Sequence, residues 1–171
     1  MNTKHTGFTL IELMVVLSIA AILVSVAIPG FRSLIQNNRL ATQANELTGT
    51  MNFARGEAIK RGQSVTVCVS TDQAGCTLGT AWAGGWIAFV DVNSNSVFNA
   101  GTDTLLRVRG ALAGGSTLTG AATAVRYQAT GLLGVGAGAY NLLTPGCTGN
   151  ERRTINITAT GRLGVARTVC P

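Results

Sequence analysis

The feature that most constrains this chain is an apolar run at residues 8–28, in which Glu12 is the only charged side chain. A helix over this run would be about 31 Å long at a rise of about 1.5 Å per residue. That length matches the hydrocarbon core of a bilayer, which is roughly 30 Å thick. A cleaved secretory signal is the alternative, since Lys4 and His5 look like a short n-region. The run is longer than the apolar core of such signals, and no A-x-A-like site follows it, so we expect a membrane-spanning helix.

The charge of Glu12 is unusual inside such a segment. A carboxylate deep in lipid costs about 2.5–3.5 kcal/mol on insertion scales. A residue with that cost indicates a partner for its charge, so Glu12 is the first candidate functional residue of the chain.

The residues around Glu12 form a recognisable motif. The sequence KHTGFTLIEL at residues 4–13, followed by the apolar run, resembles the class III leader of type IV pilins and type II secretion pseudopilins. The resemblance implies that a prepilin peptidase cleaves after Gly7 and methylates the new amino terminus at Phe8. Residues 1–7 would then be the leader peptide.

The same resemblance gives roles to the rest of the run. Glu12 matches the acidic residue that is thought to neutralise the amino terminus of a neighbouring subunit when helices pack into a filament. Pro29 falls where the family has a helix kink, and a proline within a helix removes one backbone hydrogen bond. Residues 8–29 would therefore form the transmembrane and assembly helix.

Residues 30–61 continue the helical pattern with an amphipathic segment. Apolar residues recur at steps of three, four or seven, which is typical of one apolar helix face: they are Phe31, Leu34, Ala41, Ala44, Leu47, Met51, Ala54 and Ala58. Lys60 and Arg61 suit the last turn because cations are favourable at a helix C-terminus. Gly62 is the expected end of the helix.

Beyond Gly62 the apolar period changes to two, which predicts β-strands. The first strand, at Val65, Val67 and Val69, should be half-buried. Further strands are expected at residues 86–90, 105–109, 125–128 and 154–158, with a weaker one at 162–166. The Gly- and Ala-rich segments 110–120 and 131–138 are expected to be loops. We predict an α+β fold in which an antiparallel sheet covers the amphipathic half of the helix.

Several segments of this head resemble the FimT/GspH group of minor pilins and pseudopilins. They are NFARGEA at 52–58, GQSVTV at 62–67, GWIAFVDVN at 85–93, LLR at 105–107, and INI at 155–157 leading to Gly161 and Arg162. The resemblance implies the type IV pilin-like fold, with a β-rich head at residues 62–171. It also implies assembly with other minor and major pilins or pseudopilins, processing by the prepilin peptidase, and anchoring in the bacterial inner membrane by a single span. The head would be periplasmic and later exposed on the pilus.

The four cysteines all lie in this head. Three disulfide pairings of Cys68, Cys76, Cys147 and Cys170 are possible. We favour Cys68–Cys76, which closes a short loop after a strand, together with Cys147–Cys170, which would hold the C-terminal tail. Disulfides fit a periplasmic or surface location. A zinc site is disfavoured because no short paired spacing such as C-x₂-C is present.

The net charge of +6 lies entirely in residues 107–171, where seven arginines face one acid, Glu151. Arginine suits bidentate contact with phosphate, so the region is a candidate nucleic-acid interface. FimT-type minor pilins bind DNA through a C-terminal Gly-Arg-x-Arg motif. Gly161, Arg162 and Leu163 match its first three positions, whereas Gly164 stands in place of the second arginine. The expected contacts, mainly to phosphate, are Arg162, Arg167, Arg152, Arg153 and Arg126; a merely solvated basic head is the alternative.

Other chemistry has little support in the sequence. The only histidine is His5, and no nucleophile has a partner base, so we expect no enzyme, metal or cofactor. Residues 91–95 begin like a calcium loop, but Ser96 and Thr102 replace the turn glycine and the bidentate glutamate, which favours a hairpin turn. Trp82 and Trp86 could stack on single-stranded bases, but Trp86 fits a core position.

These features predict a minor type IV pilin of FimT/GspH type that binds DNA non-specifically for uptake in natural transformation. The alternatives are a structural minor pilin that primes pilus assembly and a GspH-type pseudopilin of the type II secretion system.

Overall fold

The computed structural model describes residues 9–171, apart from the side chains of Val26 and Pro29. Gly7 and Phe8, the predicted cleavage and methylation positions, lie outside this range. The chain divides into two compact units, with the boundary between Asn38 and Arg39. A single helix, α1 (Leu10–Arg61), contributes to both units.

Local hydrogen bonds define both ends of α1. The hydroxyl of Thr9 accepts a hydrogen bond from the Glu12 backbone N–H at 3.3 Å, as an N-cap residue does. At the other end Gly62 has φ +64°, and the Gln63 N–H donates to the Ala58 carbonyl at 3.3 Å. This is the Schellman arrangement, in which glycine adopts the left-handed conformation that ends a helix. The predicted end at Gly62 is therefore confirmed.

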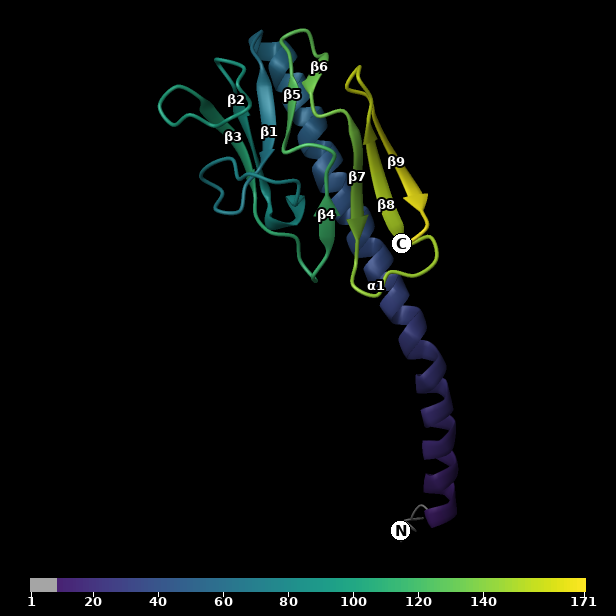
Figure 1. Cartoon of the computed structure of the whole chain (residues 1–171). Coiled ribbons are helices and arrows are strands. Elements are labelled where there is room, and N and C mark those ends of the chain that lie inside the picture. The colour runs from purple at the N-terminus through teal and green to yellow at the C-terminus, as the bar shows by residue number, and fades with distance from the viewer. Residues whose placement is uncertain (1–8) are drawn as a thin grey trace, which may run out of the picture. The chain divides into compact units, whose positions relative to one another are not determined.

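Nine strands form two antiparallel sheets in the second unit (Figure 1). The first sheet has the order β3-β2-β1-β5-β6 and the second has the order β4-β7-β8-β9. The strands of the first sheet are β1 (Val65–Val69), β2 (Trp86–Val90), β3 (Thr104–Arg109), β5 (Ala124–Tyr127) and β6 (Leu133–Val135). Those of the second sheet are β4 (Thr117–Thr119), β7 (Gly138–Leu143), β8 (Arg152–Ile157) and β9 (Leu163–Thr168).

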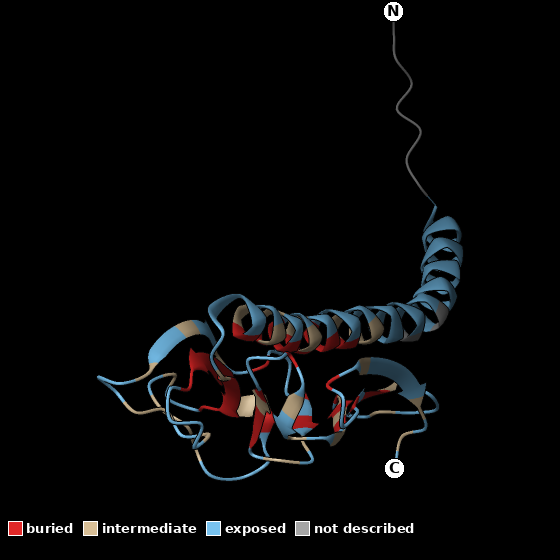
Figure 2. Cartoon of the chain, turned by 90° about the horizontal axis from the view of Figure 1, so that it is seen from above, coloured by how far each residue is buried: buried red, intermediate tan, exposed pale blue. Residues whose placement is uncertain are grey.

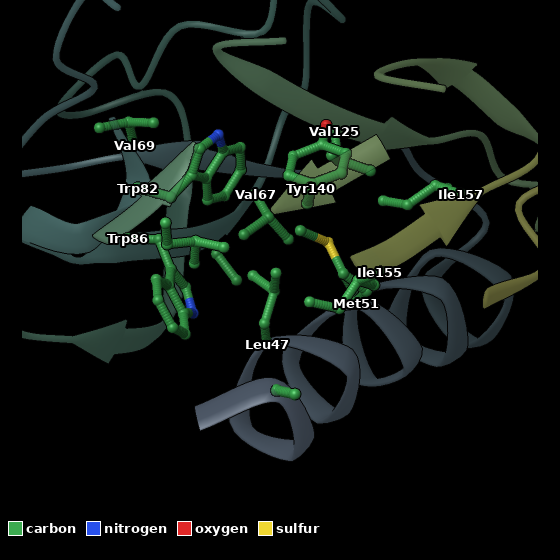
Figure 3. Close-up of a cluster of buried hydrophobic side chains, with 14 of the residues drawn as sticks. Leu47, Met51, Val67, Val69, Trp82, Trp86, Val125, Tyr140, Ile155 and Ile157 are labelled. Atoms are coloured by element: carbon green, nitrogen blue, oxygen red, sulfur yellow. The ribbon is translucent and has the colours of Figure 1, made fainter. Parts of the chain in front are cut away.

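The core lies between the two sheets and the C-terminal half of α1. Figure 3 shows Leu47 and Met51 of the helix directed toward Trp82, Trp86 and Tyr140. All five of these side chains are fully buried. Trp82 and Trp86 are therefore core residues and unavailable for base stacking. The buried helix face is completed by small residues, which allow close approach of the sheets: Ala44, Ala54 and Ala58.

The expected α+β fold, a long helix packed on antiparallel strands, is confirmed, but several details of the prediction were wrong. The head has two sheets in place of one. Segments 110–120 and 131–138 are not only loops, because they contain β4 and β6, and β7 was also missed. These strands are short or glycine-containing and carry little alternation for a pattern to detect.

The prediction that β1 is half-buried was also wrong, because all five of its residues are buried. Its outer face is covered by a second apolar cluster, in which Cys68 packs with Ile87 and Phe89. The hydroxyl of Thr66 donates to the buried Asp91 carboxylate at 2.7 Å. A central strand covered on both faces is buried throughout, even where its sequence alternates like that of a half-buried strand.

The buried part of α1 also begins later than its spacing suggested. Leu40 is fully buried, whereas Phe31 and Leu34 are 64% and 55% exposed and Ala41 is exposed too. The helix therefore changes its surroundings near the boundary between the two units. Figure 2 shows this change, because red residues appear along one part of α1 whereas the other part is pale blue.

Candidate functional site

The N-terminal half of α1 exposes apolar side chains on every face. All side chains described between Thr9 and Ile35 are exposed. They include leucine, methionine and valine at consecutive positions, for example residues 13–17. A helix that is apolar all round requires lipid or other helices around it. In the part of the chain that the structure describes, α1 is the one helix long and apolar enough to cross a membrane.

Glu12 lies in the first turn of this helix. Its carboxylate is near the N-terminal end, where the helix dipole favours negative charge. Among the described residues up to Phe31, it is the only acidic or basic side chain. The surface therefore consists of an apolar cylinder with one negative group close to its start.

The C-terminal arginines are spread over both faces of the β8–β9 hairpin. Arg153 and Arg167 lie directly opposite each other across β8 and β9. They share a face with Ile155 and Ile157, which are buried against the core. Arg153 is only 4% exposed, and its Nη1 donates to the Glu151 carbonyl at 3.0 Å. Burial and the charge of Arg167 lower the pKa of Arg153.

The remaining predicted DNA contacts differ in how accessible they are. Arg162 is exposed in the turn between β8 and β9, where it borders a shallow hollow of about 260 Å³ with Asn156 and Gly164. Arg152 is half-buried and donates from Nε to the Thr168 hydroxyl at 2.8 Å. Arg126, also half-buried, belongs to the other sheet and donates to the Ser94 carbonyl and the Ser96 hydroxyl.

The structure therefore does not gather the five predicted arginines into one patch. Arg162 and Arg167 are the exposed members, at opposite ends of β9. The prediction that Arg153 contacts phosphate is corrected, because its side chain is buried. Alternation along the sequence could have revealed this, because Arg153 is two and four residues from the apolar Ile155 and Ile157.

Two further arginines of the basic region are committed to contacts within the head. The Arg107 guanidinium lies 4.2 Å from the centre of the Phe53 ring. Arg109 forms an ion pair with Glu46, with 2.8 Å between Nη2 and Oε2. The formal charge of the region thus overstates the charge that is free to meet a ligand.

The loop after β2 is a hydrogen-bonded turn. The carboxylate of Asp91 accepts backbone N–H groups of Asn95 and Ser96 at 3.0 and 2.9 Å. Asp103 accepts the N–H groups of Val92 and Asn99 at 3.0 and 2.8 Å. Both carboxylates therefore hold the loop together, as the hairpin-turn interpretation predicts. Within residues 9–171 there is no group of three or more histidine, cysteine or acidic side chains arranged to hold a metal ion.

The head contains two disulfides, Cys68–Cys76 and Cys147–Cys170, which is the pairing that the spacing favoured. The second joins the loop after β7 to the end of β9. The Cys170 N–H also donates to the Gly149 carbonyl at 2.9 Å, so the C-terminal end of β9 is held in place.

Comparison with known proteins is consistent with this architecture. Residues 43–161 match the family described as type II transport protein GspH, and residues 2–28 match the prokaryotic N-terminal methylation motif. The pilin-like protein PilA1 of Thermus thermophilus is 36% identical over 99 residues, which are 57% of this chain and 55% of that protein. The chain thus spans about half the length of this curated relative.

Two solved structures share the fold. The type IV minor pilin FimU of Pseudomonas aeruginosa has a TM-score of 0.57 at 19% identity, over 78% of this chain and 90% of that chain. The minor pseudopilin EpsH from the type 2 secretion system of Vibrio cholerae has a TM-score of 0.51 at 13% identity, over 75% of this chain and 97% of that chain.

These findings define a minor type IV pilin or pseudopilin, and the chain belongs to the GspH family. Proteins of this family are structural subunits, in agreement with the expectation that the chain is no enzyme. The apolar helix and the family together indicate a membrane-anchored pilin.

Proposed function

We propose that this chain is a minor subunit of a type IV pilus, cleaved after Gly7 and methylated at Phe8 by a prepilin peptidase. Residues 8–29 anchor it in the inner membrane before assembly. Residues 30–61 belong to the head helix, and the head at 62–171 is first periplasmic and then exposed on the pilus. The observation that carries this proposal is the lone Glu12 on a helix that is otherwise apolar and exposed.

The charge of Glu12 gives a physical reason for this helix to assemble with the helix of a neighbouring subunit. Cleavage after Gly7 creates an α-amino group, which is cationic at neutral pH because its usual pKa is about 7.7–8.0. An unpaired charge in apolar surroundings is costly, and pairing with an opposite charge offsets that cost. A neighbouring subunit that brings its amino terminus to Glu12 would satisfy both groups.

The test is Glu12→Gln in the full-length chain, produced in its own cells. The substitution keeps the size of the side chain and removes the charge. We expect at least a tenfold loss of the chain from sheared filaments with an unchanged amount in the membrane. The control is Glu46→Gln, which breaks the ion pair with Arg109 within the head and leaves the N-terminal half unaltered. Filament levels of Glu12→Gln equal to those of the natural chain would contradict the proposal.

The alternative assemblies remain as outcomes of the same assay. Strains that lack either the pilus machinery or the type II secretion machinery provide the comparison. Dependence on the pilus machinery supports the pilus subunit. Dependence on the secretion machinery would instead identify a GspH-type pseudopilin.

A second function, capture of DNA for uptake in natural transformation, is favoured by one observation. Arg162 and Arg167 are exposed on the β8–β9 hairpin, and residues 152–171 contain no acidic side chain. Each phosphate contact contributes about −0.9 to the slope of log affinity against log salt concentration. With two contacts, the affinity for DNA should fall about tenfold between 50 and 200 mM salt. Contacts of this kind are independent of base sequence.

Fluorescent double-stranded DNA titrated against the full-length chain in detergent tests this second function. The variant Arg162→Ala/Arg167→Ala should lose most of the binding and of its salt dependence. The matched control, Lys60→Ala/Arg61→Ala, removes the same formal charge from the exposed end of α1. Equal losses of binding in both variants would mean that net charge, and not these two arginines, causes the binding. No binding at low salt would exclude DNA capture by this chain alone and leave an assembly-priming role.

A further inference from the structure

Strand β9 is an unusually regular open edge. Among the described residues the two sheets end at β3, β6, β4 and β9. Strands β4 and β6 have three residues each, and the pairing of β3 with β2 shifts register between Ala88 and Phe89. Strand β9 pairs with β8 over six residues without a shift. Short strands and bulges are ways in which proteins block edge-to-edge pairing, and β9 has neither.

The hydrogen-bond register shows which backbone groups of β9 face the open edge. The Thr158 N–H donates to the Arg162 carbonyl at 3.0 Å, next to the first paired residues of the hairpin. Hydrogen-bonded and non-hydrogen-bonded pairs alternate along an antiparallel ladder. The residues that bond to β8 are therefore Gly164, Ala166 and Thr168. Those whose N–H and carbonyl groups point outward are Leu163, Val165 and Arg167.

The side chains along this edge combine apolar surface with positive charge. Val165 is 49% exposed, and Arg167, two residues later on the same face, is exposed as well. The Cys147–Cys170 disulfide holds the end of the strand, so the edge is fixed in an extended form. Figure 1 shows β9 as the outermost strand of its sheet.

Charge decides which kind of strand fits. Residues 152–171 contain four arginines and no acidic side chain, so a second copy of β9 would bring like charges together. Directly opposed side chains on neighbouring strands have Cβ atoms about 4.5–5.5 Å apart, close enough for opposite charges to stabilise the pair. A carboxylate beside Arg167 and an apolar side chain beside Val165 would match this edge.

We propose that β9 is extended in the filament by a strand from another pilus subunit, which carries an acidic and an apolar residue two positions apart. The spacing follows from the two-residue period of a strand. The main-chain bonds would supply affinity and the two side chains specificity, as in other cases of strand addition. This inference rests on the proposed function, because it names the contact that the head would make after assembly.

Amide hydrogen exchange, resolved by residue, gives a signature of this pairing. The full-length chain is measured alone in detergent and within sheared filaments. We expect the amides of Leu163, Val165 and Arg167 to gain at least tenfold protection in filaments. The amides of Gly164, Ala166 and Thr168 bond to β8 in both states and should change much less. If the edge were buried without pairing to another strand, hydrogen exchange would slow equally in both sets of amides.

Two variants separate backbone pairing from side-chain contact. Val165→Pro removes an outward N–H without removing a bond to β8, whereas Val165→Ala keeps that N–H. We expect Val165→Pro, and not Val165→Ala, to lower incorporation into filaments at least fivefold. Arg167→Glu should lower it similarly, while Arg107→Glu on β3 makes the same charge change on the other six-residue edge and should not. Near-ultraviolet circular dichroism of each variant checks that the head is folded.

The outcomes distinguish this inference from the function on which it rests. A chain that enters filaments with its three outward amides unprotected retains the proposed function and overturns strand addition at β9. A chain that never enters filaments contradicts both. Protection that already appears in detergent and rises with protein concentration identifies a second copy as the partner, and overturns the acidic-strand proposal.

Discussion

The two halves of α1 are made of similar apolar residues but differ in what surrounds them. Leu17 in the first half is 59% exposed, whereas Leu47 in the second half is fully buried. The second half packs against sheets of its own chain through a face rich in alanine. The first half has no such cover among the described residues of its unit. The comparison teaches that one continuous helix can be stabilised by two independent environments, a protein core and a surrounding apolar medium.

The largest expected difference between the halves comes from one substitution made in each. Leu47→Ala should lower the free energy of unfolding of the head by about 2–5 kcal/mol, because it leaves a cavity in the core. Leu17→Ala should change it by less than about 0.5 kcal/mol. Urea unfolding of the full-length chain in detergent, followed by the fluorescence of Trp82 and Trp86, measures both. Equal effects of the two substitutions would mean that the halves share one core.

Alkaline pH should destabilise the head alone. Burial raises the pKa of Tyr127 to about 12 and outweighs the charge of Arg55, which lowers it. Burial also raises the pKa of Tyr140. An unfolded phenol ionises near pH 10, so the stabilising contribution is fully present below about pH 10 and is lost as pH rises toward 12. Residues 9–38 contain no tyrosine, so the helical signal of the first half should persist.

The two tyrosines also differ from each other, which sharpens this test. The Tyr140 hydroxyl donates to the Gly136 carbonyl at 2.9 Å, whereas the Tyr127 hydroxyl has no partner among the described residues. Tyr140→Phe should cost about 1 kcal/mol at neutral pH and Tyr127→Phe close to nothing. The double variant should lose most of the alkaline destabilisation. Absorbance at 295 nm showing both phenols of the folded head titrating near pH 10 would contradict this assignment.

Glycines along and beyond α1 provide the smallest contrasts. Gly56→Ala, in the exposed interior of the head helix with free space around the added methyl, should stabilise the head by about 0.5–1 kcal/mol. Gly62→Ala should destabilise it by about 1 kcal/mol, since Gly62 holds φ +64°. Gly30→Ala, also with free space, should leave head stability unchanged. The urea midpoints of the three variants provide the test. A shifted midpoint for Gly30→Ala would mean that the first half of α1 contributes to the stability of the head, which would contradict this expectation.

Much of the fold could be predicted because strong local periods decide it. The apolar run, the amphipathic spacing, the alternating residues of β1 and β3 and the continuous apolar residues of β2 each form a clear local pattern. Strands β4 and β6 have three residues each and exist through their partners, which no local pattern records. The full burial of β1 likewise depends on Ile87 and Phe89, which pack on its outer face from the neighbouring strand.

The two parts of the candidate site, Glu12 and the C-terminal arginines, differ in how well the sequence predicts them. Glu12 stands out in the sequence because a charge interrupts an apolar run, and the structure leaves it in exposed surroundings. The arginines were identified by composition, which records neither face nor partner. Arg153 and Arg167 share a face, and their different exposure follows from sheet order, because β8 is an inner strand and β9 an edge strand. The open edge of β9 is a property of sheet order and has no signature in residue type.

The central claim is that the two halves of α1 are stabilised independently, the first by lipid or neighbouring helices and the second by the head. Residue-resolved hydrogen exchange of the full-length chain in lipid nanodiscs, repeated over a series of urea concentrations, tests it most directly. We predict that amides of residues 40–61 lose protection together with the head, and earlier in Leu47→Ala. Amides of residues 10–28 should remain protected throughout while the nanodisc is intact. Loss of protection in both segments at one urea concentration would contradict the account.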